Sequence, residues 1–201
     1  MSTTLLLASA SPRRRELLQR VGLLLEVRPA DIDETPHDGE APVAYVARLA
    51  RAKAAAARQR PEEWVLAADT TVTLDGQILG KAETPEEAAK MLRWLAGNTH
   101  QVVTAFCLAG ERDGQPIVRE GVVSSDVQFI ELDGGVLADY VASGEWRGKA
   151  GAYAIQGIGA ALVAAVHGSV TNVIGLPLAE VLAALRDAGG PMPRFAAGTP
   201  A

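Results

Sequence analysis

The stretch Leu5-Leu-Leu-Ala-Ser-Ala-Ser-Pro-Arg-Arg-Arg-Glu-Leu-Leu18 is the part of the chain around which the rest is organised. Its first four residues, Leu5 to Ala8, predict a short buried strand. The apolar residues that follow Pro12 have helical spacing, so a helix is expected to begin just after Ser11. Serine is a good N-cap and proline suits the first helical position. The stretch therefore predicts a strand, a turn and an amphipathic helix.

The first turn of this helix carries three arginines, Arg13, Arg14 and Arg15. The helix dipole is positive there, so each cation costs about 0.3–1 kcal/mol. Backbone N–H groups, the hydroxyls of Ser9 and Ser11 and the guanidinium groups together suit a phosphate. A basic turn that is simply solvated would explain the same residues.

The composition restricts the class of protein. The chain has 201 residues, a formal net charge of −5 and a single cysteine, Cys107. The negative charge disfavours a nucleic-acid or anionic-membrane binder, and one cysteine provides neither a disulfide framework nor a cysteine zinc site. No secretory signal and no spanning apolar run is visible, so a cytoplasmic location is expected. We expect one two-lobed α/β domain over residues 1–190 and a disordered tail over 191–201.

Two carboxylates stand in unusual settings. Glu34 lies in the loop from Pro29 to Pro36, which also contains Asp31 and Asp33. Such a loop is either solvated or a site for Mg²⁺ or Mn²⁺, whose preferred ligands are oxygens. Asp69 stands in the middle of an apolar run, where a buried carboxylate needs a cation, a metal or several donors. A structural ion pair with an arginine would meet the same need.

The order of predicted elements is that of an α/β protein. Residues 64–74 predict a buried strand. Asp75-Gly76 predicts a tight hairpin that brings Lys81 back alongside Asp69. A helix is expected from Pro42 to about Arg60, with Lys53 at the edge of its apolar stripe, either extending to solvent or directed into a site. Residues 99–109 and 116–130 predict a long hairpin with a polar turn at 110–114.

A glycine-rich segment follows, from Ser143 to Gly159. Lys149 lies among residues that let a backbone approach a ligand closely. Tyr153 could stack on a base, and the amide of Gln156 could form paired hydrogen bonds with one.

The charged residues in these segments are complementary. A polyphosphate with a divalent metal needs carboxylates for the metal and basic side chains for the phosphates. The carboxylates are Glu34 and Asp69, and the cations are Arg13, Arg14, Lys53, Lys81 and Lys149. Neither a Walker A sequence nor a G-x-G-x-x-G motif after a strand is present. Hydrolysis by an activated water therefore fits better than a kinase or P-loop mechanism.

The sequence resembles the Maf family of nucleoside triphosphate pyrophosphatases, whose members were once described as septum-formation inhibitors. The matching motifs occur in family order over nearly the whole chain: Leu7-Ala-Ser-Ala-Ser-Pro-Arg-Arg14, Asp33-Glu34, Leu49-Ala-Arg-Ala-Lys53, Ala68-Asp-Thr70, Gly80-Lys81, Lys149-Ala-Gly-Ala-Tyr-Ala-Ile-Gln-Gly157 and Val173-Ile-Gly-Leu-Pro177. The resemblance implies a mixed β-sheet flanked by helices, with two lobes and a central cleft, related to the inosine triphosphatase-like (Ham1) proteins. It also implies cleavage of a nucleoside triphosphate to the monophosphate and pyrophosphate with Mg²⁺ or Mn²⁺.

The resemblance implies a role for each matching residue. Asp69 resembles the general base that activates water, or a metal ligand, and Glu34 resembles a metal or water ligand. The polyphosphate set corresponds to Ser9, Arg13, Arg14, Lys53 and Lys81, to which we add Lys149. Arg13, Thr70 and Gln156 match positions associated with base choice and indicate the dTTP/UTP branch.

Two further expectations come with the family. Its members are often dimers, so a homodimer is one expected state. The alternative function is a regulator of septum formation that senses a nucleotide with little turnover. Binding of nucleic acid through Arg13, Arg14 and Arg15 is disfavoured by the net charge.

Overall fold

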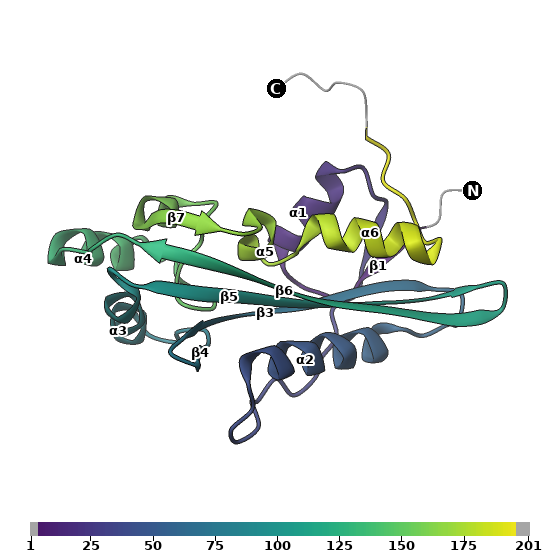
Figure 1. Ribbon diagram of the computed structural model, residues 1–201, viewed down its shortest axis with the longest axis horizontal. Helices are drawn as coiled ribbons and strands as arrows, with labels where there is room; N and C mark the ends of the chain where they lie inside the picture. Colours follow the sequence, from purple (N-terminus) through teal and green to yellow (C-terminus); the bar gives the residue numbers. More distant parts are fainter. Residues whose placement is uncertain (1–3, 196–201) are drawn as a thin grey trace.

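The computed structural model describes residues 4–195, and one mixed seven-stranded sheet organises them (Figure 1). The strand order is β2-β1-β3-β5-β6-β7, with β4 paired to β3 beside this path. The strands are β1 (Leu5–Leu7), β2 (Leu25–Val27), β3 (Trp64–Leu74), β4 (Gln77–Leu79), β5 (Thr99–Arg112), β6 (Gln115–Phe129) and β7 (Val163–His167). β1 pairs in parallel with β2 and β3, and the remaining pairs are antiparallel. The predicted mixed α/β class is confirmed.

Helices cover both faces and one end of this sheet (Figure 1). They are α1 (Pro12–Arg20), α2 (Pro42–Ala57), α3 (Pro85–Leu95), α4 (Gly134–Ser143), α5 (Val170–Ile174) and α6 (Leu178–Ala188), with a 3₁₀ helix, η1, at Ile158–Leu162. α2 lies on one face, α1, α5 and α6 lie on the other, and α3 and α4 lie at one end. None of the helices between residues 4 and 195 has the length and apolarity that a membrane span requires.

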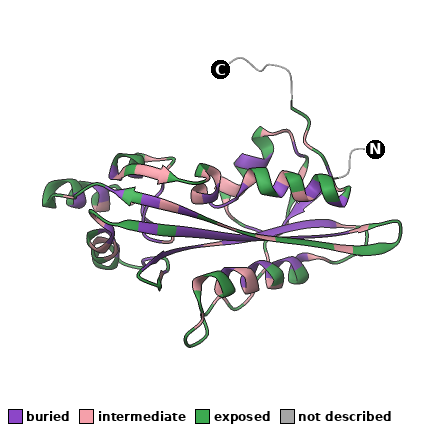
Figure 2. Ribbon diagram, viewed as in Figure 1, coloured by how far each residue is buried: buried purple, intermediate pink, exposed green. Residues whose placement is uncertain are grey.

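Three apolar cores follow from this arrangement. Alternate residues of β3 point to opposite faces, so Val65 and Ala67 pack with α2 while Leu66 and Ala68 pack with the core on the α1 and α6 side. A third core surrounds Leu92 and joins α3, α4 and the ends of the long strands. β5 is buried along most of its length, whereas β6 is exposed over much of its own (Figure 2).

The sheet has a gap beside β3. β5 occupies one edge of β3 from Val65 to Thr73, so β1 and β4 must share the other edge. β1 pairs there with residues 64–66 and β4 with residues 72–74. Within residues 4–195, no strand pairs with residues 67–71 on that edge. Side chains from both faces of the sheet can therefore meet at this point.

Local sequence signals explain several element ends. Ser11 caps α1 as predicted, and Thr84 caps α3, where its hydroxyl accepts a hydrogen bond from the N–H of Glu87. The Asp75-Gly76 hairpin is also confirmed: both residues have positive φ, at 51° and 77°, as a type I′ turn requires.

The structure corrects three sequence predictions. The β5–β6 turn is not the five residues 110–114 but the tight pair Asp113-Gly114, whose φ values of 54° and 74° let both strands continue further. α2 ends at Ala57 and not near Arg60, because Arg58 is extended and the carboxylate of Glu63 accepts the N–H groups of residues 59 and 60. The short helix α5 was not predicted; its five residues are too few to show helical periodicity.

Part of the predicted tail packs against the molecule. Pro191 is buried, and the N–H of Arg194 donates to the carbonyl of Gly22. Residues 196–201, the rest of that predicted disordered segment, lie outside the described residues.

We predict that Leu92→Ala lowers the free energy of unfolding by about 2–5 kcal/mol, because Leu92 is fully buried in the core beside α3. Leu24→Ala is the matched control, since Leu24 is 52% exposed and its loss should change stability by less than about 0.5 kcal/mol. Urea denaturation measures both. Equal losses in the two variants would contradict the assigned core.

Candidate functional site

A cavity of about 540 Å³ opens at the free edge of β3. We call it the cleft. Its lining contains all ten residues to which the sequence analysis assigned a catalytic, metal, phosphate-binding or base-choice role: Ser9, Arg13, Arg14, Glu34, Lys53, Asp69, Thr70, Lys81, Lys149 and Gln156. They come from α1, α2, β3 and four loops, so this set is assembled by the fold and not by one segment.

Lys53 lies between the two carboxylates of the cleft. Its Nζ is 2.5 Å from Oδ1 of Asp69 and 2.7 Å from Oε1 of Glu34. Asp69 and Lys53 are each only 7% exposed, so each charge needs the other. Asp69 reaches Lys53 because it lies on the α2 face of β3, in line with Val65 and Ala67.

Glu34 lies between two lysines. Besides Lys53, its carboxylate is 3.7 Å from Nζ of Lys81. Burial raises the pKa of Glu34, but the hydrogen bond and charge of Lys53 and the charge of Lys81 outweigh burial and lower it below the usual value. Lys81, which was expected alongside Asp69, lines the same cleft, where its ammonium pairs with Glu34. It follows the end of β4 at Leu79 and forms an isolated backbone bridge with Ala150.

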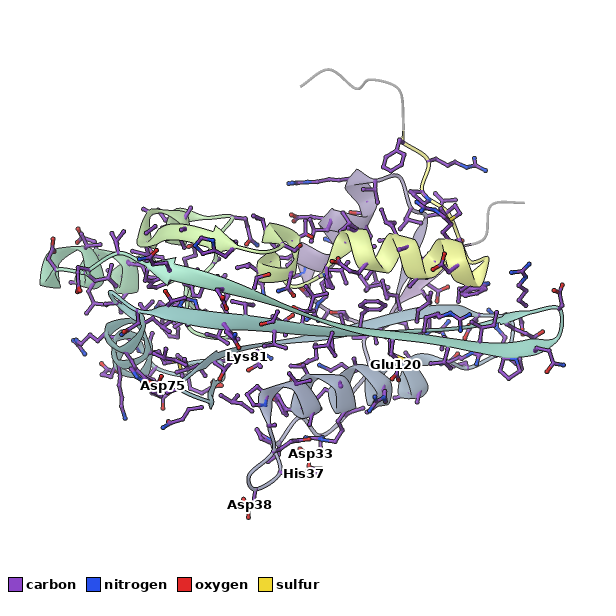
Figure 3. The ribbon with its side chains drawn as sticks, in the orientation of Figure 1. Asp33, His37, Asp38, Asp75, Lys81 and Glu120 are labelled. Carbon is purple, nitrogen blue, oxygen red and sulfur yellow. The ribbon has the colours of Figure 1, made fainter. Side chains whose placement is uncertain are left out.

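The other carboxylates of the Glu34 loop do not line the cleft. Asp33 accepts a hydrogen bond from the N–H of Thr35 at 2.8 Å. Figure 3 shows Asp33, His37 and Asp38 in the loop that precedes α2, pointing away from the sheet, whereas Lys81 lies beside it. Only Glu34 of the three predicted loop carboxylates therefore contributes to the site.

Tyr45 and Arg48 of α2 fix the Glu34 loop, and sequence reasoning missed them. The hydroxyl of Tyr45 donates to the carbonyl of Glu34 at 3.0 Å. Arg48 donates to the carbonyl of Thr35 and forms two hydrogen bonds with the carboxylate of Glu40, at 2.7 and 2.6 Å. Tyr45 precedes Lys53 by eight residues, which puts both near one face of the helix, but this spacing does not indicate a contact with the Glu34 loop.

Arg14 is held in place by three protein groups. Its Nε donates to the carbonyl of Gly175 at 2.8 Å, Nη1 to Oγ of Ser9 at 3.1 Å and Nη2 to Oγ1 of Thr70 at 3.0 Å. A guanidinium has five N–H donors, so two remain for a ligand. Thr70 lies on the α1 face of β3, opposite to Asp69, and its hydroxyl also contacts Thr104 at 2.9 Å.

Ser9 is arranged as a donor toward the cleft. Its Oγ accepts from the N–H of Ser11 at 3.2 Å and from Arg14. These two bonds use both lone pairs of the hydroxyl, so its own proton is the group left for a ligand. This agrees with a phosphate oxygen as the expected partner.

Three cations of the cleft have no carboxylate partner among residues 4–195: Arg13, Arg14 and Lys149. Burial lowers the pKa of all three, and the charge of Arg13 lowers the pKa of Lys149 further. By contrast, Arg28, Arg48 and Arg51 pair with glutamates, and the hydrogen bonds raise the pKa of each. The cleft therefore favours an anionic ligand.

Tyr153 is a buried residue of the cleft lining, and its hydroxyl is already paired within the protein. The hydroxyl contacts Nε2 of His100 at 2.8 Å, and the two rings meet edge to face. Burial raises the pKa of Tyr153, so the phenol stays protonated. Gln156, three residues later, is exposed at the rim of the cleft.

The residues present fit a divalent metal that arrives with a phosphate ligand. Within residues 4–195 no three His, Cys, Asp or Glu side chains cluster as a metal site. Glu34 and Asp69 nevertheless share one ammonium, so their oxygens lie close together. Mg²⁺ is commonly held by one or two carboxylates together with substrate phosphates, which is the donor set that this cleft can supply.

Comparison with known proteins places the chain in a family. Residues 4–188 match the family described as Maf-like protein. The chain belongs to this family. The resemblance seen in the motifs is thereby confirmed.

Individual relatives of this Maf-like chain cover almost its whole length. A protein named dTTP/UTP pyrophosphatase from Myxococcus xanthus (strain DK1622) is 54% identical over 192 residues, which are 95% of each chain. A protein of the same name from Anaeromyxobacter dehalogenans (strain 2CP-1) is 51% identical over 193 residues, 96% of this chain and 98% of the relative. Among solved structures, the Ham1 protein of Staphylococcus aureus has a TM-score of 0.39 at 20% identity and covers 66% of this chain and 77% of its own.

We predict that protonation of His100 makes stability depend on pH. His100 is 1% exposed, and burial lowers its pKa from 6.5 to about 4. Between these values the unfolded chain binds a proton that the folded chain does not, so stability falls as the pH falls, by roughly 1.4 kcal/mol per pH unit. Urea denaturation at pH 7 and pH 4.5 should show a smaller loss for His100→Gln than for the wild type. Parallel losses would contradict this assignment.

Proposed function

We propose that this protein hydrolyses dTTP and UTP to the nucleoside monophosphate and pyrophosphate. The observation that carries the proposal is the cleft itself, in which a carboxylate pair bridged by Lys53 lies beside cations that have no carboxylate partner in the described part of the chain. The names of the relatives from Myxococcus and Anaeromyxobacter support the reaction and the two substrates.

The triphosphate would lie against the start of α1. Backbone N–H groups and the helix dipole favour anions at this position. The hydroxyl proton of Ser9, the two remaining donors of Arg14 and the charge of Arg13 would bind phosphate oxygens there. Lys149 would approach from the glycine-rich loop on the other side of the cleft, where it also lines the cavity.

Asp69 would act as the general base. The water oxygen forms a bond with the α-phosphorus. The bond between the α-phosphorus and the oxygen that bridges it to the β-phosphorus breaks, and pyrophosphate leaves with the electrons of that bond. The proton of the water passes to the carboxylate of Asp69, which is held by Lys53. Glu34 and Asp69 would also hold Mg²⁺ or Mn²⁺, which when bound neutralises charge on the phosphates. Lys53 and Lys81 would take up part of the charge that develops on the leaving group.

Base choice would come from Gln156, with Thr70 and Arg13 acting nearby. The amide can accept from N3–H and donate to O4 of uracil or thymine. Thr70 is committed to Arg14 and Thr104, so it would influence the substrate through the position of Arg14 and not by touching the base.

We predict that Asp69→Asn keeps the fold and loses most turnover, by at least about 100-fold, because asparagine preserves volume but removes the base. The assay incubates the protein with Mg²⁺ or Mn²⁺ and a panel of nucleoside triphosphates, and detects pyrophosphate separately from phosphate. EDTA should abolish release by the wild type. Nucleotide binding without turnover by the wild type would refute the hydrolase and favour a nucleotide sensor.

We predict that Gln156→Glu lowers kcat/KM for UTP and dTTP by about tenfold or more, because a carboxylate has no donor for O4 and leaves that oxygen unpaired. The midpoint of urea denaturation should stay near that of the wild type, since Gln156 is exposed. Steady-state kinetics with UTP, dTTP and CTP test this. The same preference among the three bases in both proteins would remove Gln156 from base recognition.

A further inference from the structure

Glu145 joins two loops of the cleft. Its carboxylate accepts from the N–H of Ile158 at 2.9 Å and from the N–H of Gly159 at 2.7 Å, and the hydroxyl of Tyr140 donates to it at 3.1 Å. Ile158 and Gly159 begin η1, directly after the segment that carries Gln156.

Glu145 replaces a cap that the local sequence lacks. The first N–H groups of a helix have no partner within it and are usually satisfied by the side chain of the N-cap residue. Here the N-cap is Gly157, which has no side chain, and no side-chain cap bond is formed from it. A Cβ at Gly157 would lie 1.9 Å from Oε1 of Glu145, so the absence of a side chain at this position leaves room for the carboxylate.

The loop of Glu145 is itself fixed. The neighbouring Trp146 is 2% exposed, and its indole N–H donates to the carbonyl of Val141 at 3.0 Å. Lys149 donates to the carbonyls of Glu145 and Arg147. The carboxylate therefore extends from an anchored loop to the loop of Gln156.

We propose that Glu145 is a positioning residue for base recognition, which holds the Gln156 segment at the rim of the cleft by capping η1. This inference rests on the proposed function. An amide side chain must be placed well to present a donor and an acceptor to the two adjacent atoms of a uracil edge. Among residues 4–195 the carboxylate of Glu145 bonds to the backbone of that segment and forms no hydrogen bond or ion pair with a phosphate-binding side chain. Its charge raises the pKa of Lys149, but this effect is smaller than that of burial, so the loss of Glu145 should weaken base binding more than phosphate binding.

The test compares Asp69→Asn with the double variant Asp69→Asn/Glu145→Gln, so that binding is measured without turnover. Glutamine has a similar shape, but it loses the charge and one acceptor that serve the two N–H groups. By titration calorimetry with Mg²⁺, the dissociation constant of UTP should rise about tenfold, while that of pyrophosphate stays within about twofold. Asp69→Asn/Tyr140→Phe is the matched control: it removes one bond to the same carboxylate, leaves both N–H bonds, and should bind UTP unchanged.

Equal weakening of UTP and pyrophosphate, or no weakening of either, would overturn this inference. If the glutamine variant does not fold, Glu145→Asp replaces it. Aspartate keeps the charge, but its shorter side chain moves the carboxylate away from the two N–H groups, so UTP binding should again weaken while pyrophosphate binding stays nearly unchanged. Turnover by the wild type is assayed separately, so failure of the hydrolase proposal can be told apart from failure of this inference. If the hydrolase proposal fails, the wild type releases no pyrophosphate, whatever the dissociation constants of UTP and pyrophosphate in the Glu145 variants.

Discussion

The ammonium of Lys53 between Asp69 and Glu34 is the interaction on which the cleft depends. A carboxylate in the middle of a buried strand would be very costly without a partner, and a buried lysine has the same need. Their contact at 2.5 Å ties α2 to β3, and the second contact ties the Glu34 loop to both. Tyr45 then fixes the backbone of that loop, so the charges of the site are held by a rigid helix and a central strand.

The gap in the sheet decides what can meet these charges. Adjacent residues of a strand point to opposite faces, so Asp69 faces α2 while Thr70 faces α1. In a continuous sheet the two faces would be separated. Because β1 ends and β4 begins on the same edge of β3, the carboxylate side and the arginine side open onto one cavity. The cleft thus combines an acidic and a basic surface, as a metal-bound polyphosphate requires.

Much of this arrangement can be predicted from the sequence, because it depends on local signals. Ser11-Pro12, Thr84 and Asp75-Gly76 are local signals whose consequences depend on a few neighbouring residues. The site residues could be named because aspartate in a strand and arginines at a helix start conflict with local preference. Their presence in one cleft is a property of the fold.

Features that depend on distant contacts could not be predicted. Glu145 caps a helix thirteen residues further along the chain, and nothing in its own neighbourhood indicates that role. Tyr45 appears as an ordinary helix residue until the Glu34 loop is seen to fold over it. Arg14 resembles Arg13 in the sequence, yet three protein acceptors fix Arg14, which makes it a part of the cleft wall and leaves two of its five N–H donors for a ligand.

The most direct test of the account is a crystal structure with α,β-imido-UTP and Mn²⁺, whose anomalous signal locates the metal. We expect the triphosphate along the start of α1 within reach of Ser9, Arg13 and Arg14, the metal bound to Glu34 or Asp69, and uracil at Gln156. A triphosphate bound away from α1, or a metal that contacts neither carboxylate, would contradict the account.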